Sequence, residues 1–330
     1  MDTIEEAVNT LMTHDNFVLA THLNPDGDAL GSLMGLGLAI LSTGRRAEMI
    51  MPHPVPSAFQ FMPGTRQVRQ TPLHPAGFDV GIALDCTDLN RLGDEPRKML
   101  RNSGKLVNID HHISNSFFGD INVVDAQASA TGEIIYDILL KAKITVTKEI
   151  ATDLFTALVT DTGSFQHQNT TPKCFRTAAG LLECGALHSI VHQHLYEQKT
   201  PASLRLLSRA LESLSLNENG TLAWITVSRD LLSACGASAE DSEGMTDYLQ
   251  SLKGVEAGIL FKEINRGEIK VSFRSKQYLD VNRLAAYFGG GGHARAAGCT
   301  IIGKIKDVEQ IVIRKTDEQL SLKDNGGHGR

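Results

Sequence analysis

Short apolar runs that end in polar side chains recur through the first half of this chain. They limit the possible fold classes more than any other feature of the sequence. The runs are NFVLATH at 16–22, FDVGIALD at 78–85 and KLVNID at 105–110. Almost continuous apolar runs of this length are typical of strands in a parallel sheet that is covered on both faces. The spacing of apolar residues predicts helices at 29–41, 129–142, 148–160 and 173–184. Strands that alternate with helices in this way predict an α/β fold with a parallel sheet.

The second half of the chain has a different pattern. Strands are predicted at 221–228, 255–264 and 268–276, with a hairpin turn at 265–267. Between the halves, Pro201 suits the first turn of a helix whose leucines form one stripe. A chain of 330 residues is long enough for two domains. We therefore predict a first domain at 1–190, a helical linker at 191–216 and a smaller α+β domain at 217–330, whose end KDNGGHGR is disordered.

Charge, hydropathy and cysteine usage exclude several classes of protein. The net charge of −6 argues against a protein that coats long duplex DNA. No run reaches the roughly 18 to 20 apolar residues of a membrane-spanning helix, and the acidic N-terminus lacks the basic start of a secretory signal. The five cysteines are scattered without a C-x-x-C pair, so we expect neither a disulfide framework nor a structural zinc site. We expect a cytoplasmic protein that does not contact a membrane.

The loop after the first run carries three side chains of the kind that bind metals. His22, Asp26 and Asp28 lie close together in the sequence, and Pro25 and Gly27 predict an irregular loop in which they can converge. Two carboxylates and an imidazole at this spacing favour a bound cation, and this donor set suits Mn²⁺ or Mg²⁺. The alternative is that Asp28 caps the following helix and His22 merely ends a strand.

The other two runs also end in candidate ligands. Asp85 ends the second run, and the sequence Asp110-His111-His112 ends the third. Ligands of open α/β sheets bind outside the carboxyl ends of the strands, so we expect these side chains to meet the first cluster. The alternatives are that Asp85 is a turn residue, that Asp88 takes its place, and that the two histidines lie in a surface loop.

A further carboxylate, Asp161, follows the helix predicted at 148–160. The sequence Asp161-Thr-Gly163 is also a common helix stop. Asp161 is therefore a candidate ligand only in combination with the other clusters. Two divalent ions about 3.5–4 Å apart can activate a water and stabilise the leaving oxygen of a phosphoester. Such a pair needs about seven protein ligands, one of them a bridging carboxylate, and the clusters supply that number. These residues therefore predict metal-dependent phosphoester chemistry.

Near the C-terminus, the segment Gly289-Gly-Gly-Gly-His293-Ala-Arg295 lies in a locally basic stretch. Residues 262–295 hold seven Lys and Arg against three acidic residues. Four glycines leave backbone N–H groups open to a phosphate, and the small residues that follow suit the start of a helix aimed at it. Arg295 can fork onto phosphate oxygens, and His293 can donate to them. The alternatives are a flexible loop and ordinary surface charge.

Together and in this order, the motifs resemble the DHH phosphoesterase superfamily. They are H-x-x-x-D-x-D at 22–28, the strand-terminal Asp85, Asp-His-His at 110–112, D-T-G-S-F at 161–165 and G-G-G-H-x-x-A-A-G at 290–298. Within it the chain is most similar, from about residue 1 to residue 315, to the NrnA-type nanoRNases with a smaller DHH-associated C-terminal domain. This likeness implies a phosphoric ester hydrolase that acts on very short RNA oligonucleotides and on 3′-phosphoadenosine 5′-phosphate.

The resemblance also implies a role for each matching metal-binding residue. The ligands of one ion would be His22 and Asp26, those of the other would be Asp28, His111 and Asp161, and the bridging ligand would be Asp85. Asp85 and His112 would be the catalytic residues, with His112 near the scissile phosphate as a polariser or proton donor. The cofactor would be two Mn²⁺ ions, with Mg²⁺ or Co²⁺ as substitutes.

The same likeness assigns the far end of the substrate to the C-terminal part. The residues that would hold it are Arg274, Ser275, His293, Arg295, Gly290, Gly291 and Gly292. The partners would be short oligonucleotides and small nucleotides, without long duplex nucleic acid or a membrane, and a homodimer is left open.

One departure from the family pattern leaves the substrate preference open. Many relatives continue D-T-G-S-F with Arg and an aromatic residue, whereas this chain has Gln166 and His167. The alternative functions are a cyclic or linear dinucleotide phosphodiesterase and, with less support, a RecJ-like single-strand exonuclease or a pyrophosphatase. A nucleotide-binding protein without catalysis is the alternative from a different class.

Overall fold

The computed structural model of the chain describes residues 3–74, 77–292 and 294–324, and it divides into two compact units. The first unit ends at Gln198 and the second begins at Lys199. This division falls inside the linker predicted at 191–216, and the exact domain bounds stay a prediction. Most of the C-terminal KDNGGHGR lies outside the described residues. Within the described residues, no helix has both the length and the apolar character needed to cross a membrane.

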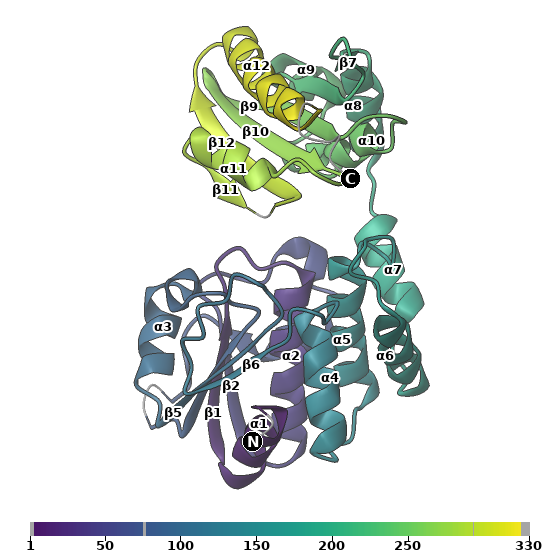
Figure 1. The fold of residues 1–330 in the computed structure, drawn as a ribbon. Coiled ribbons are helices and arrows are strands. Elements are labelled where there is room, and N and C mark those ends of the chain that lie inside the picture. Colours follow the sequence, from purple (N-terminus) through teal and green to yellow (C-terminus); the bar gives the residue numbers. More distant parts are fainter. Residues whose placement is uncertain (1–2, 75–76, 293, 325–330) are drawn as a thin grey trace. The chain divides into compact units, whose positions relative to one another are not determined.

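The first unit is a sheet of parallel strands with helices on both faces (Figure 1). Its strands are β1 (Asn16–Thr21), β2 (Arg46–Ile50), β3 (Val68–Arg69), β4 (Val80–Leu84), β5 (Lys105–Asp110) and β6 (Ile121–Val124). Its α-helices are α1 (Thr3–Thr13), α2 (Gly27–Ser42), α3 (Asp94–Arg101), α4 (Thr131–Lys141), α5 (Lys148–Asp161), α6 (Pro172–Glu183) and α7 (His188–Tyr196). Its 3₁₀ helices are η1 (Ser57–Phe59), η2 (Pro63–Gln67) and η3 (Leu89–Leu92). The predicted α/β class with a parallel sheet is confirmed.

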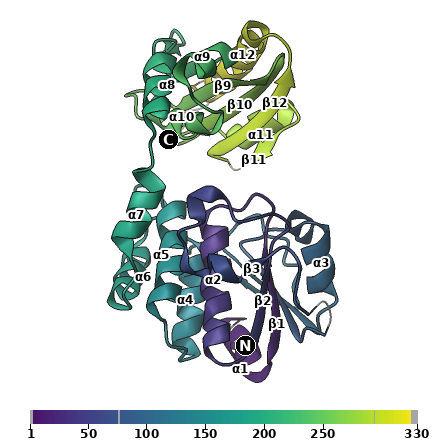
Figure 2. The same cartoon turned by 180° about the vertical axis from the view of Figure 1, so that it is seen from behind.

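The strand order is β3-β2-β1-β4-β5-β6, so the chain reverses its direction of travel between β1 and β4. Helices α2, α4 and α5 cover one face, and α3 covers the other (Figures 1 and 2). The strand β1 shows why the runs are apolar throughout. Phe17 and Leu19 pack into the core under α2 and α5, whereas Val18 and Ala20 pack into the core under α3. Alternate side chains point to opposite faces, and both faces are buried.

The helix α2 packs tightly on α5 and begins at the candidate metal centre. Asp26 caps it by accepting a hydrogen bond from the N–H of Ala29 at 3.0 Å. The two helices approach closely at Gly31, where a Cβ atom would lie 2.4 Å from the carbonyl oxygen of Asp153. At the start of α2, a Cβ atom on Gly27 would lie 2.4 Å from the side chain of Thr160, so the acidic residues there lie against the C-terminal end of α5.

The second unit is a mixed sheet with helices. Its strands are β7 (Ser215–Leu216), β8 (Leu222–Val227), β9 (Ala257–Asn265), β10 (Glu268–Ser275), β11 (Gly291–Gly292) and β12 (Ala296–Ile302). Its helices are α8 (Pro201–Leu211), α9 (Arg229–Cys235), η4 (Glu240–Ser242), α10 (Met245–Gln250), α11 (Val281–Tyr287) and α12 (Ile305–Asp324). The strand order is β11-β12-β10-β9-β8-β7. Among the described strands of this second sheet, only β8 and β9 pair in parallel. The three predicted strands are present, and the hairpin between β9 and β10 is confirmed.

One prediction for this unit is wrong. The small residues after the glycine run do not start a helix but form β12, which pairs with β10 and with β11. The glycines serve this pairing, since a Cβ atom at Gly290 would lie 2.1 Å from the carbonyl oxygen of Gly298. Thr300, Ile301 and Ile302 then continue the strand, because β-branched side chains favour extended backbone.

Candidate metal centre

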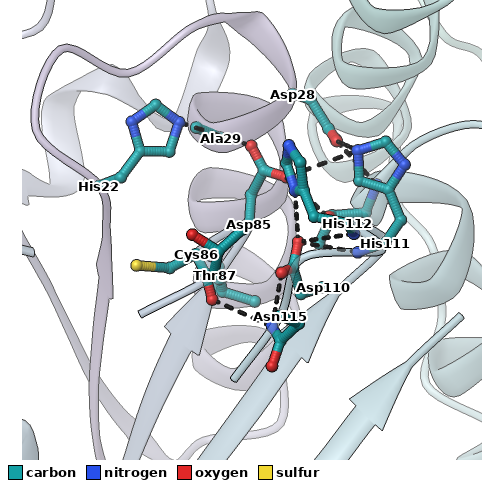
Figure 3. Close-up of polar contacts among 12 residues, drawn as sticks. His22, Asp28, Ala29, Asp85, Cys86, Thr87, Asp110, His111, His112 and Asn115 are labelled. Carbon is teal, nitrogen blue, oxygen red and sulfur yellow. Dashed lines mark hydrogen bonds and ion pairs between the residues drawn. The ribbon is translucent and has the colours of Figure 1, made fainter. Parts of the chain in front are cut away.

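The carboxyl ends of three neighbouring strands bring the predicted acidic and histidine residues together. His22 follows β1, Asp85 follows β4, and Asp110 ends β5 (Figure 3). These strands are adjacent in the sheet, and β1 and β4 flank the point where the strand order reverses. Open α/β sheets bind their ligands at this point, outside the carboxyl ends of the strands. We call the six residues that gather here the candidate metal centre: His22, Asp26, Asp28, Asp85, His111 and Asp161.

The ligand atoms of the candidate metal centre fall into groups that could each hold one ion. One group is His22, Asp26 and Asp85, and another is Asp28, His111 and Asp161. A third group joins Asp85 to His111 and His112. Within each group the candidate atoms lie within 4.8 Å of one another.

The two histidines of the centre are oriented as metal ligands usually are. Nδ1 of His22 lies 2.8 Å from the carbonyl oxygen of Leu23, and Nδ1 of His111 lies 3.2 Å from that of Ala128. A carbonyl oxygen only accepts, so both Nδ1 atoms must carry the proton. A neutral ring then presents the lone pair of Nε2, and ligating histidines typically use their second nitrogen in this way.

The Nε2 atoms face carboxylate oxygens at distances longer than a hydrogen bond. Nε2 of His22 lies 3.6 Å from Asp85. Nε2 of His111 lies 3.7 Å from Asp28 and 3.6 Å from Asp161. Two ligand atoms at roughly 2.1 Å from one ion lie about 3 to 3.5 Å apart at ordinary coordination angles. The three separations are slightly longer than this range, so a cation would fit between each imidazole and its carboxylates after a small approach of the side chains.

Asp85 lies between the two histidines (Figure 3). Its Oδ2 faces His22, and its Oδ1 lies 3.8 Å from Nε2 of His111. The backbone of Asp85 has a φ of 52°, which is uncommon for a residue with a side chain. This left-handed turn directly follows β4 and holds the carboxylate in the buried space between the strand ends. Each oxygen of one carboxylate thus faces a different histidine.

Asp28 is held by the start of α4. Its carboxylate accepts hydrogen bonds from the N–H groups of Thr131 at 2.7 Å and Gly132 at 3.0 Å. It also accepts from the hydroxyl of Ser32 at 3.1 Å. The sequence left open that Asp28 caps α2, but the capping residue is Asp26. Asp28 instead points into the centre, where it is 1 % exposed.

The candidate metal centre brings several carboxylates together in a mostly buried place, and this crowding shifts their pKa values. Burial raises the pKa of Asp28 well above its usual range, and the nearby Asp85 and Asp161 raise it further. Burial likewise raises the pKa of Asp161 to about 6. Burial would raise the pKa of Asp85 as well, but the nearby imidazoles of His22, His112 and His111 lower it to about 2. Crowded carboxylates of this kind are stabilised by a divalent ion.

Asp161 is the last residue of α5, where the chain turns sharply. Gly163, Ser164 and Phe165 have φ values of 55°, 58° and 66° in succession. The side chain of Asn169 returns to the helix end and donates to Oδ2 of Asp161 at 3.1 Å. The sequence D-T-G-S-F therefore ends the helix and also places a carboxylate in the centre, so the two readings of this motif are not exclusive.

His112 differs from His111 in how its ring is held. Its Nδ1 lies 2.7 Å from Oδ1 of Asp110, a direct hydrogen bond. Asp110 is fully buried, and its Oδ2 accepts from the side-chain amide of Asn115. Burial lowers the pKa of His112, but the hydrogen bond to Asp110 and the charge of Asp85 outweigh it and raise the pKa to about 9. His112 is thus held differently from His111, by a carboxylate at Nδ1, and it can carry a proton beside the centre.

Asp88, the alternative to Asp85, has a local role. Its Oδ1 accepts from the N–H of Asn90 at 2.7 Å and caps η3. Asp88 belongs to none of the groups that could hold an ion among the described residues.

The predicted substrate contacts of the second unit are engaged to different degrees. Ser275 is buried, and its hydroxyl donates to the carbonyl oxygen of Leu279 at 2.6 Å. One guanidinium nitrogen of Arg295 donates to the same oxygen at 2.8 Å, and the rest of this side chain is exposed. Arg274 is half-buried and lies 3.9 Å from Asp247. Gly291 and Gly292 are exposed in β11, Gly290 is half-buried, and His293 lies outside the described residues.

Three residues of the site were missed by reasoning from the sequence. Thr131 donates its hydroxyl to Asp85, Asn115 holds Asp110, and Asn169 holds Asp161. Asn115 follows the Asp-His-His motif closely enough to be suspected from its position. Thr131 lies 46 residues from Asp85 in the sequence, and no local pattern connects the two.

The fold and the site define this protein as an α/β protein with a largely buried cluster of Asp and His side chains, Asp26 alone being exposed, that could hold divalent cations. The chain belongs to the DHH family: residues 16–160 match the DHH family, N-terminal domain, and residues 230–320 match the DHHA1 domain. Its relatives include the bifunctional oligoribonuclease and PAP phosphatase NrnA of Thermus thermophilus, which is 33% identical over 92% of this chain and 90% of the relative. The protein of the same name from Bacillus subtilis is 29% identical over 90% and 92%.

A solved structure shows the same fold over almost the whole chain. The exopolyphosphatase-related protein from Bacteroides fragilis matches with a TM-score of 0.87 and 25% identity, over 97% of this chain and 95% of that protein.

Proposed function

We propose that this protein is a metal-dependent phosphoesterase that hydrolyses very short RNA oligonucleotides and 3′-phosphoadenosine 5′-phosphate. The observation that carries the chemistry is the pair of histidines, each with Nδ1 tied to a backbone carbonyl and Nε2 turned to an oxygen of Asp85. The substrate class is supported by the NrnA relatives, since the likeness runs through both units at up to 33% identity.

The residues of the candidate metal centre would hold two Mn²⁺ ions. The ligands of one ion would be His22 and Asp26, those of the other would be Asp28, His111 and Asp161, and Asp85 would bind both. When bound, such a pair activates the attacking water and stabilises the leaving oxygen of a phosphoester. The donor set fits, because it joins hard carboxylate oxygens to neutral imidazoles and leaves Mg²⁺ or Co²⁺ as substitutes.

His112 would give a proton to the leaving oxygen. Asp110 holds its Nδ1 at 2.7 Å and thereby fixes the plane of the ring. Asn115 in turn holds Asp110 and also bonds the side chain of Asn108, so the ring rests on a buried network. A positioned general acid of this kind contributes about 10²- to 10⁴-fold to a rate.

The second unit would bind the far end of the substrate. Arg295 is exposed and uses one guanidinium nitrogen to bond the carbonyl oxygen of Leu279, and Arg274 lies on the neighbouring strand β10. These side chains would bind a phosphate or base edge together with the glycines of β11, Gly290 and His293. The hydroxyl of Ser275 would contact substrate only by leaving the carbonyl oxygen of Leu279.

A panel of substrates tests this proposal. The full chain is assayed with Mn²⁺ on RNA of two to five nucleotides, long single-stranded RNA, cyclic dinucleotides, pyrophosphate and 3′-phosphoadenosine 5′-phosphate. We expect the highest kcat/KM on the shortest RNAs and on 3′-phosphoadenosine 5′-phosphate, and loss of all activity with a chelator. A preference for long strands, cyclic dinucleotides or pyrophosphate would replace the substrate class, and activity that survives chelation would overturn the metal-dependent mechanism.

A further inference from the structure

The start of α4 is built around the candidate metal centre. The carbonyl oxygen of Ala128 accepts from Nδ1 of His111 at 3.2 Å and thereby sets the orientation of that ring. Three residues later, the N–H groups of Thr131 and Gly132 point at the carboxylate of Asp28. The N-terminus of a helix favours negative charge, so these donors stabilise an ionised Asp28. One short segment thus orients two of the six candidate ligands through its backbone.

Thr131 reaches a third ligand through its side chain. Its hydroxyl donates to Oδ1 of Asp85 at 3.0 Å, and both residues are buried. The histidine nitrogens around this carboxylate lie farther away, His22 at 3.6 Å, His111 at 3.8 Å and His112 at 3.5 Å. Among these contacts within the described part of the chain, the bond from Thr131 is therefore the shortest.

This hydrogen bond controls a rotation that the backbone leaves open. The φ of 52° at Asp85 sets the direction of its Cβ atom. The carboxylate can still turn about the Cβ–Cγ bond, because torsions that end in a planar group have broad, weak preferences. A donor fixed on α4 holds Oδ1 on the side of His111 and thereby leaves Oδ2 on the side of His22. An ionised carboxylate oxygen has two acceptor sites, so Oδ1 can accept this bond and still bind an ion.

We propose that Thr131 is a positioning residue of the metal centre: its hydroxyl fixes the rotation of Asp85 so that one carboxylate oxygen serves each ion. This inference rests on the proposed function, since it takes Asp85 as the ligand shared by two ions. Without the hydroxyl, the carboxylate turns more freely and holds the two ions less well together. Loss of a hydrogen bond behind a metal ligand typically weakens metal binding or activity by about 10- to 100-fold.

Two substitutions at this position separate the hydroxyl from the shape of the side chain. Thr131→Val keeps the branched shape and the backbone N–H that holds Asp28 but removes the hydroxyl. Thr131→Ser keeps the hydroxyl and removes only a methyl group. Thr156→Val is the matched control, because Thr156 is also fully buried in a helix and its hydroxyl donates to the carbonyl oxygen of Thr152 at 2.9 Å, away from the candidate ligands.

The experiment measures Mn²⁺ binding to each metal-free full-length protein by calorimetric titration, and the coupling of the bound ions by electron paramagnetic resonance. We expect Thr131→Val to bind at least one of the two ions about 10- to 100-fold more weakly and to lose the coupled dimanganese signal. Thr131→Ser and Thr156→Val should match the wild type in both measurements. The kcat of Thr131→Val on a dinucleotide should recover in part as Mn²⁺ is raised, since the ligands themselves remain.

Two results would overturn the role of Thr131. One is wild-type Mn²⁺ affinity and coupling in Thr131→Val, and the other is an equal loss in Thr131→Ser, which would mean that packing and not the hydroxyl matters. If Thr131→Val does not fold, Thr131→Ala makes the same comparison, because it removes the hydroxyl and adds no atom. A wild-type protein that binds no second ion would instead refute the two-ion function on which the inference rests, and this outcome is seen before any variant is made.

Discussion

The candidate metal centre of the first unit and the glycine segment of the second unit (residues 289–295) differ in how their polar groups are engaged. In the metal centre, Asp28 and Asp85 are almost completely buried, and each accepts hydrogen bonds from a neighbouring element. In the glycine segment, Gly291, Gly292 and Arg295 are exposed. The carboxylates of the first region are thus held by protein contacts, whereas these residues of the second region are open to solvent.

The difference agrees with the ligands that we propose for the two regions. A small divalent ion needs several oxygen and nitrogen atoms at fixed distances, and buried hydrogen bonds supply that rigidity. A nucleotide brings its own shape and charge, so a surface of backbone N–H groups and one arginine is sufficient. Substitutions in the first region should therefore act on metal binding, and substitutions in the second should act on substrate affinity alone.

The strongest test of the first region is the removal of the shared carboxylate. Asp85→Asn should lose Mn²⁺ binding and lower kcat/KM on the order of 10³-fold, because a bound metal supplies several kcal/mol of transition-state stabilisation. Asp88→Asn is the control, since asparagine caps a helix as well as aspartate does. Metal analysis and kinetics of both variants decide the matter. An Asp85→Asn protein that still holds two ions would remove the bridging role.

The two adjacent histidines should separate metal binding from proton transfer. His111→Gln should weaken Mn²⁺ binding and activity together, because its Nε2 faces Asp28 and Asp161. His112→Gln should lower kcat by about 10²-fold or more, with KM and Mn²⁺ affinity almost unchanged, because its Nδ1 is bonded to Asp110. Titration with Mn²⁺ and steady-state kinetics measure these effects. Equal loss of metal in both variants would show that His112 is a ligand.

The second region should respond with substrate affinity. Arg295→Gln should raise KM by about 10-fold or more and leave kcat and Mn²⁺ affinity nearly unchanged, since a charged hydrogen bond contributes about 1.5–3 kcal/mol. Arg283→Gln is the matched control, because Arg283 is an exposed arginine that pairs with Asp280 on its own helix. Kinetics on a dinucleotide and on 3′-phosphoadenosine 5′-phosphate provide the comparison. A fall in kcat at constant KM for Arg295→Gln would place this arginine at the reacting phosphate.

The smallest expected effect is on stability, at the buried Asp153. It tests whether burial of a carboxyl group is enough to indicate a metal site. Burial raises the pKa of Asp153 well above its usual range, although the N–H of Gly64 donates to Oδ2 at 3.0 Å. The native state therefore keeps a proton that the unfolded chain releases above about pH 4. The wild-type free energy of unfolding should fall as pH rises from there toward the native pKa, and Asp153→Asn should lack this slope.

Thermal unfolding of the metal-free proteins at pH 5 and pH 8 measures this difference. We expect Asp153→Asn to gain about 2–4 °C relative to the wild type at pH 8, which corresponds to about 1 kcal/mol in a unit of this size. Its gain at pH 5 should be smaller, and Mn²⁺ binding should be unchanged, because Asp153 belongs to none of the groups that could hold an ion among the described residues. Weaker Mn²⁺ binding in this variant would link the buried acid to the metal centre after all.

The strands that carry the candidate metal centre could be predicted because each is buried on both faces. The elements β1, β4 and β5 appear as continuous apolar runs. His22 and Asp85, which end two of the runs, and His111, which directly follows the third, enter the centre. Strand β6 was not predicted, since it has only four residues, and neither was α12. The helix predicted after the glycine run is instead β12, because close approach of β11 to β12 requires glycine just as a phosphate loop does.

The sequence by itself determined which side chains gather in the first unit. Strand-end Asp and His residues in a parallel sheet must meet at one edge, so their types and positions were enough to predict the cluster. Only the tertiary structure decided how each is oriented. The carbonyl oxygen of Ala128 that sets His111, and the hydroxyl of Thr131 that sets Asp85, come from a segment that no local pattern relates to them. A hydrogen bond depends on positions within a few tenths of an ångström, and such positions are fixed by packing between elements distant in the sequence.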